Sequence, residues 1–246
     1  MDENMDKSMD KSMDKNMYMY AKKKMVIGIV IGLFLGWLIT WAVMMPKTGS
    51  GWQQPTTTTN TTTVSQGLNL KQLMVYQTMD KLWLEHVWWT REYLKATISN
   101  SKDTTMVAAR LLKNQEDIGN SIKSVYGEAA GVQLTTLLKA HIEGAVDLVA
   151  AAKSGNQAKI TVANTAWYAN ADQIASFLAN ANPSWNLSDL TSMMHTHLDL
   201  TKQEALDLIG KKYDASIMDF QKVEDEILMM SSSLSQGVIK QFPGSF

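Results

Sequence analysis

The chain has 246 residues, with 23 Lys and Arg, 24 Asp and Glu, and no cysteine. The missing cysteines exclude disulfides, thiolate nucleophiles and cysteine metal sites, so packing alone must stabilise the fold. From Val64 onward 19 acidic residues face 16 basic ones without a basic stripe, and nucleic acid is therefore not an expected partner.

Residues 1–24 form a low-complexity segment in which a methionine recurs every fourth position: Met1, Met5, Met9, Met13 and Met17. A spacing of four drifts by about 40° per step around an α-helix, so these side chains make a poor buried stripe. We predict a solvated cytoplasmic tail, with a weak membrane-surface helix as the alternative.

Residues 25–45 are an uncharged apolar run, long enough to cross a hydrocarbon core about 30 Å thick. The run exceeds a signal-peptide core and lacks a small-residue cleavage site, so we predict an uncleaved transmembrane helix in the lipid bilayer. Lys22, Lys23 and Lys24 precede it and only Lys47 follows, which places the N-terminus in the cytoplasm and the remainder outside it.

Gly28, Gly32 and Gly36 repeat at every fourth position within this run. Such a ridge lets two helices approach closely in lipid and predicts a homo-oligomer through the anchor. The alternative is that glycine is simply common in membrane helices.

Residues 46–67 are rich in threonine and punctuated by glycine and proline, without apolar periodicity. This composition predicts a flexible or glycosylated stalk. Asn60, within it, and Asn186, far beyond it, each begin an N-x-S/T triplet, a glycosylation signal only where the host uses it.

Residues 68–246 carry apolar residues at helical spacing and no alternating strand pattern, which predicts an all-α extracytoplasmic domain. Asp103 and Ser188 are expected N-caps. The sequence predicts six helices near 68–99, 104–126, 130–153, 156–180, 188–210 and 213–236. Together with the anchor, the expected fold is one transmembrane helix plus a six-helix bundle of three helical hairpins.

Three histidines, His86, His141 and His197, lie at almost equal intervals along the chain, in segments that align without gaps. Each falls on the apolar seam of its predicted helix. The pattern predicts a threefold repeat of a helical hairpin, with one histidine from each hairpin facing the interior.

The second helices of the hairpins also carry acidic residues at similar intervals from the histidines. Asp117 follows His86 at the same interval at which Asp172 follows His141, and the third hairpin offers Glu224 and Glu226 instead. Imidazoles with one or two carboxylates suit Zn, Fe or Mn, so the three histidines with Asp117 and Asp172 are candidate metal ligands. The chain has no HEXXH or EXXH motif, and His195 is expected to be solvated.

Several segments resemble an uncharacterised family of small all-helical proteins from Gram-positive, spore-forming bacteria: "LWLEHVWWTR", "AARLLKN", "WYANADQIASFLANANPSW", "HLDLTKQEA" and "IKQFP". The resemblance covers about residues 78–243 and implies an all-helical fold but no activity. It implies a polar set at the positions of His86, Thr90, Arg91, Arg110, Asp117, His141, Asn170, Asp172, His197, Thr201 and Glu204. Gln115 departs from the family, which tends to have proline there.

No catalytic residue can be assigned, because no nucleophile elbow or phosphate loop is present in the sequence. Arg110 is expected to pair with Asp117 or Asp172, or else to bind an anionic ligand. The leading hypothesis is a membrane-anchored interaction or structural module of the cell envelope, with an unknown protein partner and no predicted cofactor. The alternatives are a metal-binding or metal-dependent protein using a divalent transition metal, and a bundle with a small-ligand pocket. The seam histidines are expected to fix helix register rather than to bind metal.

Overall fold

The computed structural model describes residues 68–246. The predicted tail, the 25–45 helix with Gly28, Gly32 and Gly36, and the stalk with Asn60 lie outside the described residues. None of the helices between residues 70 and 241 combines the length and the apolar character needed to cross a membrane.

The described part of the chain is all-helical, as predicted, with six long helices and one short one. The predicted ranges agree with the observed ones to within a few residues at most ends. The helices are α2 (Leu70–Ser99), α3 (Thr104–Ser121), α4 (Lys123–Tyr126), α5 (Glu128–Ser154), α6 (Gln157–Ala181), α7 (Leu187–Ile209) and α8 (Tyr213–Gln241).

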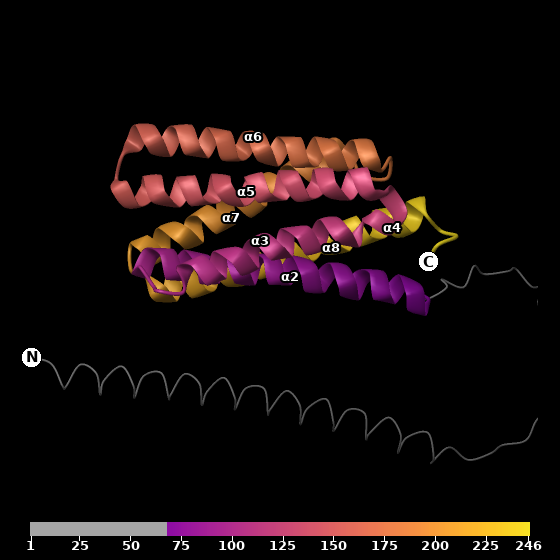
Figure 1. Cartoon of the computed structure of the whole chain (residues 1–246), viewed down its shortest axis with the longest axis horizontal. Coiled ribbons are helices and arrows are strands. Elements are labelled where there is room, and N and C mark those ends of the chain that lie inside the picture. The colour runs from indigo at the N-terminus through magenta and orange to yellow at the C-terminus, as the bar shows by residue number, and fades with distance from the viewer. Residues whose placement is uncertain (1–67) are drawn as a thin grey trace, which may run out of the picture. The chain divides into compact units, whose positions relative to one another are not determined.

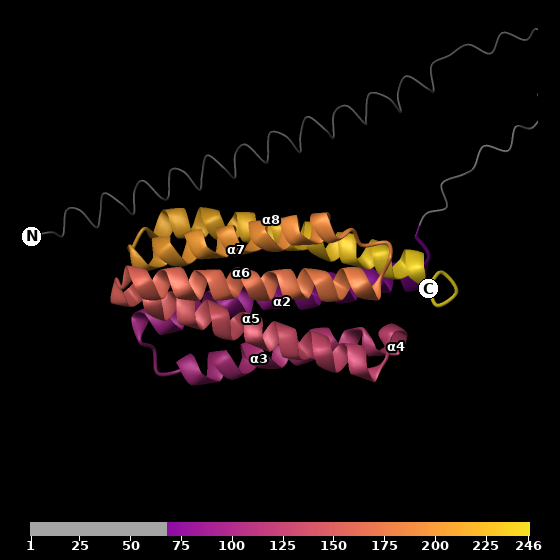
Figure 2. The same ribbon diagram turned by 90° about the horizontal axis from the view of Figure 1, so that it is seen from above.

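The six long helices form a closed ring in which each packs against two neighbours, in the order α2, α3, α5, α6, α7, α8 and back to α2. Short connections make consecutive helices antiparallel, so that α2, α5 and α7 run in one direction and α3, α6 and α8 in the other (Figure 1). The view from above shows α7 and α8 on one side and α3 with α5 on the other (Figure 2). The ring therefore consists of three hairpins, α2–α3, α5–α6 and α7–α8, around a shared interior.

Asparagine caps three of the helices. The side chains of Asn69, Asn156 and Asn186 accept hydrogen bonds from backbone N–H groups in the first turns of α2, α6 and α7. The prediction of Ser188 as a cap is wrong, because its N–H donates to the Asn186 side chain at 2.8 Å. Asp103 does precede α3, but its side chain makes no capping hydrogen bond. Asn186 is exposed and caps through Oδ1.

Two predicted ends were wrong. Helix α3 stops at Ser121, and α4 forms a separate turn, where the sequence predicts one helix to residue 126. Helix α8 continues to Gln241 rather than ending near residue 236. It continues because Gly237 does not break the helix but faces the Trp185 indole, which lies so close that a Cβ on Gly237 would clash with Nε1.

One core cluster runs the length of the ring and contains residues from every long helix. Trp83, Trp167 and Trp185 are buried in it, whereas Trp88 is exposed and packs edge-on against Phe220. These tryptophans are thus core and rim aromatics.

Candidate functional site

Three histidines from three different hairpins meet in the interior of the bundle. His86 lies on α2, His141 on α5 and His197 on α7, and all three are buried. The ring centroids are 6.4 Å apart for His86 and His141, 5.7 Å for His86 and His197, and 6.3 Å for His141 and His197. The prediction that one histidine from each hairpin faces the interior is confirmed, and we call these three residues the histidine cluster.

Each histidine lies near a polar side chain from the antiparallel helix of its own hairpin. His141 Nδ1 lies 3.0 Å from Asn170 Oδ1 on α6, and His197 Nδ1 lies 3.2 Å from Glu226 Oε2 on α8. Gln115 on α3 stands at the corresponding position near His86. Each partner follows its histidine at the same interval along the chain, so the threefold repeat extends to these polar pairs.

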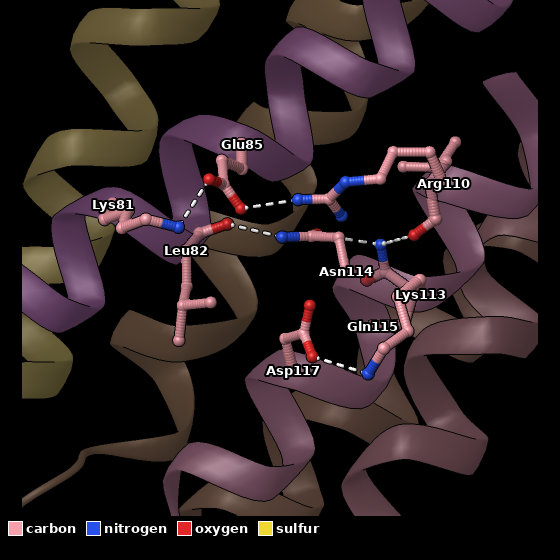
Figure 3. Close-up of polar contacts among 9 residues, drawn as sticks. Lys81, Leu82, Glu85, Arg110, Lys113, Asn114, Gln115 and Asp117 are labelled. Atoms are coloured by element: carbon pink, nitrogen blue, oxygen red, sulfur yellow. Dashed lines mark hydrogen bonds and ion pairs between the residues drawn. The ribbon is translucent and has the colours of Figure 1, made fainter.

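Asn170 has two roles that the first hairpin divides between two residues. Its Nδ2 donates to the carbonyl of Leu137 at 3.1 Å, one turn before His141, while its Oδ1 bonds the His141 ring. In the first hairpin Asn114 Nδ2 donates to the carbonyl of Leu82 at 3.0 Å, one turn before His86, and Gln115 lies next to it (Figure 3). His86 Nδ1 and Gln115 Oε1 are both buried and make no hydrogen bond.

The two predicted aspartates lie away from the histidine cluster. Asp117 pairs with Lys113 at 2.7 Å on α3 (Figure 3), and Asp172 pairs with His195 Nε2 at 2.8 Å. Both pairs are substantially exposed to solvent. The structure therefore does not bring Asp117 and Asp172 together with the three histidines.

Arg110 pairs with a residue that the sequence did not single out. Its Nη2 donates to Glu85 Oε2 at 2.9 Å (Figure 3). Its guanidinium lies 5.2 Å from the centroid of Trp89. The expected pairing with Asp117 or Asp172 is wrong, because Glu85 on α2 faces Arg110 directly across the first hairpin. The Lys81 and Arg110 cations outweigh partial burial and lower the pKa of Glu85.

Arg91 and Glu204, two of the candidate polar residues, form a buried ion pair between α2 and α7. Arg91 also donates to the Ser216 carbonyl at 3.2 Å and lies 4.7 Å from the centroid of Phe220. Burial raises the pKa of Glu204 to about 7, although the Arg91 guanidinium opposes this shift. The pair joins the two hairpins beyond the histidine cluster.

An apolar cavity of about 90 Å³ lies farther along α2, α5 and α7, and none of the three histidines lines it. Thr90, Ala145 and Thr201 line it, and each stands one helical turn beyond one of the three histidines. The Thr90 hydroxyl donates to the His86 carbonyl at 2.7 Å, whereas the Thr201 hydroxyl is buried without a partner.

Two of the cluster histidines are held in their neutral form. Burial, with His197 and His141 nearby, lowers the pKa of His86 well below its usual range. Burial likewise lowers the pKa of His141 to about 3. A neutral imidazole has a lone pair for a metal, so these two rings are in the ligand-competent state at physiological pH.

The spacing of the three rings is close to that of a three-histidine metal centre. A point equidistant from the centroids lies about 3.5 Å from each, and a Zn–N bond of 2.0–2.1 Å places a metal about 3.2 Å from an imidazole centroid. Within residues 68–246, no group of three or more His, Asp or Glu side chains is arranged to hold an ion as it stands. The rings would have to move inward and rotate before all three could bind one ion.

Sequence reasoning found the three histidines and Asn170 but missed Gln115, Glu85 and the role of Glu226. The constant interval between each histidine and its partner was the available signal. Comparisons with family models, with curated proteins and with solved structures give no match to this chain. The family resemblance therefore stays a prediction.

Proposed function

We propose that this protein binds a divalent transition metal through His86, His141 and His197, in a helical domain that the 25–45 anchor holds outside the cytoplasm. The single observation that carries the proposal is the meeting of three buried imidazoles, one per hairpin, within 5.7–6.4 Å of one another. Three histidines are a common protein ligand set for zinc and related ions. The broader role as an interaction or structural module of the envelope stays a prediction.

The hydrogen bonds around the cluster support a metal over a purely structural role. Metal-binding histidines usually donate their second ring N–H to a carboxylate or carbonyl oxygen, which fixes the tautomer and the ring orientation. Asn170 Oδ1 and Glu226 Oε2 supply such acceptors at Nδ1 of His141 and His197. The Nε2 atoms of these rings remain for the metal.

The charge of the site favours a cation. Glu226 is buried, and His197 is its one ion-pair neighbour within the described residues. A buried carboxylate is costly unless a neighbouring cation offsets it, and a dication held by His197 would supply such a charge. Asn170 and Gln115 are neutral, so one carboxylate against one dication keeps the net charge of the site low.

Metal analysis of the full chain, purified without a polyhistidine tag, tests the proposal. We expect about one Zn²⁺ or Co²⁺ per chain after loading and dialysis, and a chelator should lower the melting temperature. His141→Gln should abolish stoichiometric binding. His195→Gln is the matched control, because His195 also bonds a neighbour on another helix but lies outside the cluster.

A second variant tests the hydrogen-bonded acceptor. Glu226→Gln should keep the fold and weaken metal affinity by roughly 10- to 100-fold, the usual effect of losing such a partner. Metal content that is negligible in the wild type, or unchanged in His141→Gln, would leave the histidines as core residues that fix helix register.

A further inference from the structure

We infer that a hollow at one end of the bundle binds an amphipathic organic anion, a small molecule with an apolar body and a carboxylate or phosphate group. The hollow lies where α2, α5 and α7 end and α8 begins, at the end of the bundle away from α4 (Figure 1). None of the three histidines lines it. The site is therefore separate from the proposed metal site and goes beyond it.

The charges around the hollow favour an anion. Four cationic side chains line it and no acidic one does: Arg91, Lys95, Lys153 and Lys211. Neighbouring glutamates pair with the first two. Within residues 68–246, Lys153 bonds only neutral oxygens, and Lys211 makes no side-chain hydrogen bond or ion pair. Four cations less two paired glutamates leave a surplus of two positive charges around the hollow.

The helix ends account for one of these two lysines but not for the other. The terminal carbonyls of α2, α5 and α7 carry a partial negative charge, which favours a nearby cation. The Lys153 ammonium satisfies this preference, because it donates to the carbonyl of Thr97 in the last turn of α2 at 2.7 Å. The Lys211 ammonium donates to none of the described carbonyls, so its charge is available to a ligand.

Lys211 also occupies a backbone position that normally suits glycine. Its φ is 57°, in the left-handed region. The N–H of Lys212 closes the end of α7 there by donating to the carbonyl of Asp207 at 2.8 Å. Glycine is the usual residue at this point of such a helix end, because a Cβ is unfavourable in the left-handed region. The lysine is thus unfavourable for the backbone, and a binding role for its ammonium accounts for its presence.

The apolar part of the lining favours an organic anion over an inorganic one. Leu208 is buried, whereas Tyr213 and Ile217, at the start of α8, are each 60% exposed. The hollow has a volume of about 700 Å³, within the range of about 300–1,000 Å³ that is typical of small-molecule sites. Such sites are mostly apolar and orient the ligand through a few polar groups. An anion with an apolar body therefore matches the hollow in size, polarity and charge.

Isothermal titration calorimetry of naphthoate against the full chain in zwitterionic lipid nanodiscs tests this site. Naphthamide is the uncharged probe of the same shape, and empty nanodiscs give the heat of partitioning into lipid. We expect saturable binding of one naphthoate per chain and roughly tenfold weaker binding of naphthamide, which cannot form a charge-assisted hydrogen bond with a lysine. The absence of saturable heat with naphthoate, or equal affinity for the two probes, would overturn the proposal.

Lys211→Gly separates binding from folding. It removes the ammonium and places glycine at a left-handed position, so it should not lower the melting temperature, yet it should weaken naphthoate binding roughly tenfold. Lys240→Gln is the control, because it removes the same charge at the other end of α8 and should bind naphthoate like the wild type. An equal loss of affinity in both variants, or no loss in Lys211→Gly, would show that naphthoate does not bind in the hollow.

Ile217→Glu and Met218→Glu form a second matched pair. Both residues are exposed on α8, but only Ile217 lines the hollow. A carboxylate at position 217 repels an anion and should abolish naphthoate binding, whereas one at position 218 should change it little. An acidic peptide with one aromatic residue is titrated in parallel. Binding of the peptide without binding of naphthoate would overturn the small-molecule class and assign the hollow to a protein partner.

Discussion

Replacing Arg91 with methionine should destabilise the bundle strongly, because it leaves Glu204 buried without its cation. Only 12% of the Arg91 side chain and 2% of the Glu204 side chain are exposed. Breaking a buried pair by removing one partner costs about 3–5 kcal/mol. Methionine keeps most of the apolar contact with Phe220, so the loss of charge dominates.

The cost should depend on pH, because Glu204 can take up a proton instead of remaining charged. The pKa of Glu204 in the folded protein is raised to about 7, above the value of 4.5 expected when it is unfolded. Its contribution to stability is therefore fully present below about pH 4.5 and is lost as the pH rises through 7. Without Arg91 the folded pKa rises further, so Arg91→Met should cost most near pH 8 and about 1.4 kcal/mol less near pH 5.5.

Denaturant unfolding of the full chain, followed by circular dichroism at both pH values, measures this effect. Glu204→Gln in the Arg91→Met background removes the stranded charge and should recover most of the loss at pH 8. Lys95→Met is the control on the same helix, since the Lys95–Glu92 pair is half-exposed and should cost less than about 1 kcal/mol. The reasoning fails if Arg91→Met costs no more than Lys95→Met, or if its cost is the same at both pH values.

Two further predictions concern packing and topology. Gly237→Ala should cost about 1–3 kcal/mol despite the better helix propensity of alanine, because its Cβ would clash with Trp185 Nε1; thermal unfolding should show this loss in Gly237→Ala and not in Gly244→Ala, where a Cβ meets nothing within 4 Å. Protease added outside intact cells should remove the domain after Thr48 and spare residues 1–24, as the lysine asymmetry predicts; protection of the helical domain would reverse the predicted orientation.

The fold of residues 68–246 could be predicted from sequence because its determinants are local. Apolar residues at helical spacing indicated the six helices, and the gapless echo around His86, His141 and His197 indicated the three hairpins. The end of α8 could not be predicted, because Gly237 favours a helix end locally. Only the approach of Trp185 from the α6–α7 connection gives this glycine a packing role inside the helix.

The partners of the histidines were missed because residue type was matched before helical register. Asp117 and Asp172 are the same residue type and follow the preceding histidine at the same interval. Each stands two positions beyond the true partner, however, and two positions correspond to about 200° around a helix. They therefore lie on the faces opposite to Gln115 and Asn170, which turn inward toward His86 and His141. The informative register position was the one that Gln115, Asn170 and Glu226 occupy, although their residue types differ. The identical residue type of Asp117 and Asp172 indicated the wrong position.

The chemistry of those three partners argues that the cluster needs a cation. Asn170 Nδ2 donates to Leu137, so its Oδ1 must accept, and the His141 Nδ1 that faces it must carry the proton. Glu226 imposes the same tautomer on His197. The His141 ring, held neutral by burial, then presents only a lone pair at Nε2 to a buried interior. One proton can bridge only two ring nitrogens, whereas a metal ion can bind all three rings of the cluster. We therefore expect the loss of any one histidine to abolish metal binding rather than to weaken it by a third.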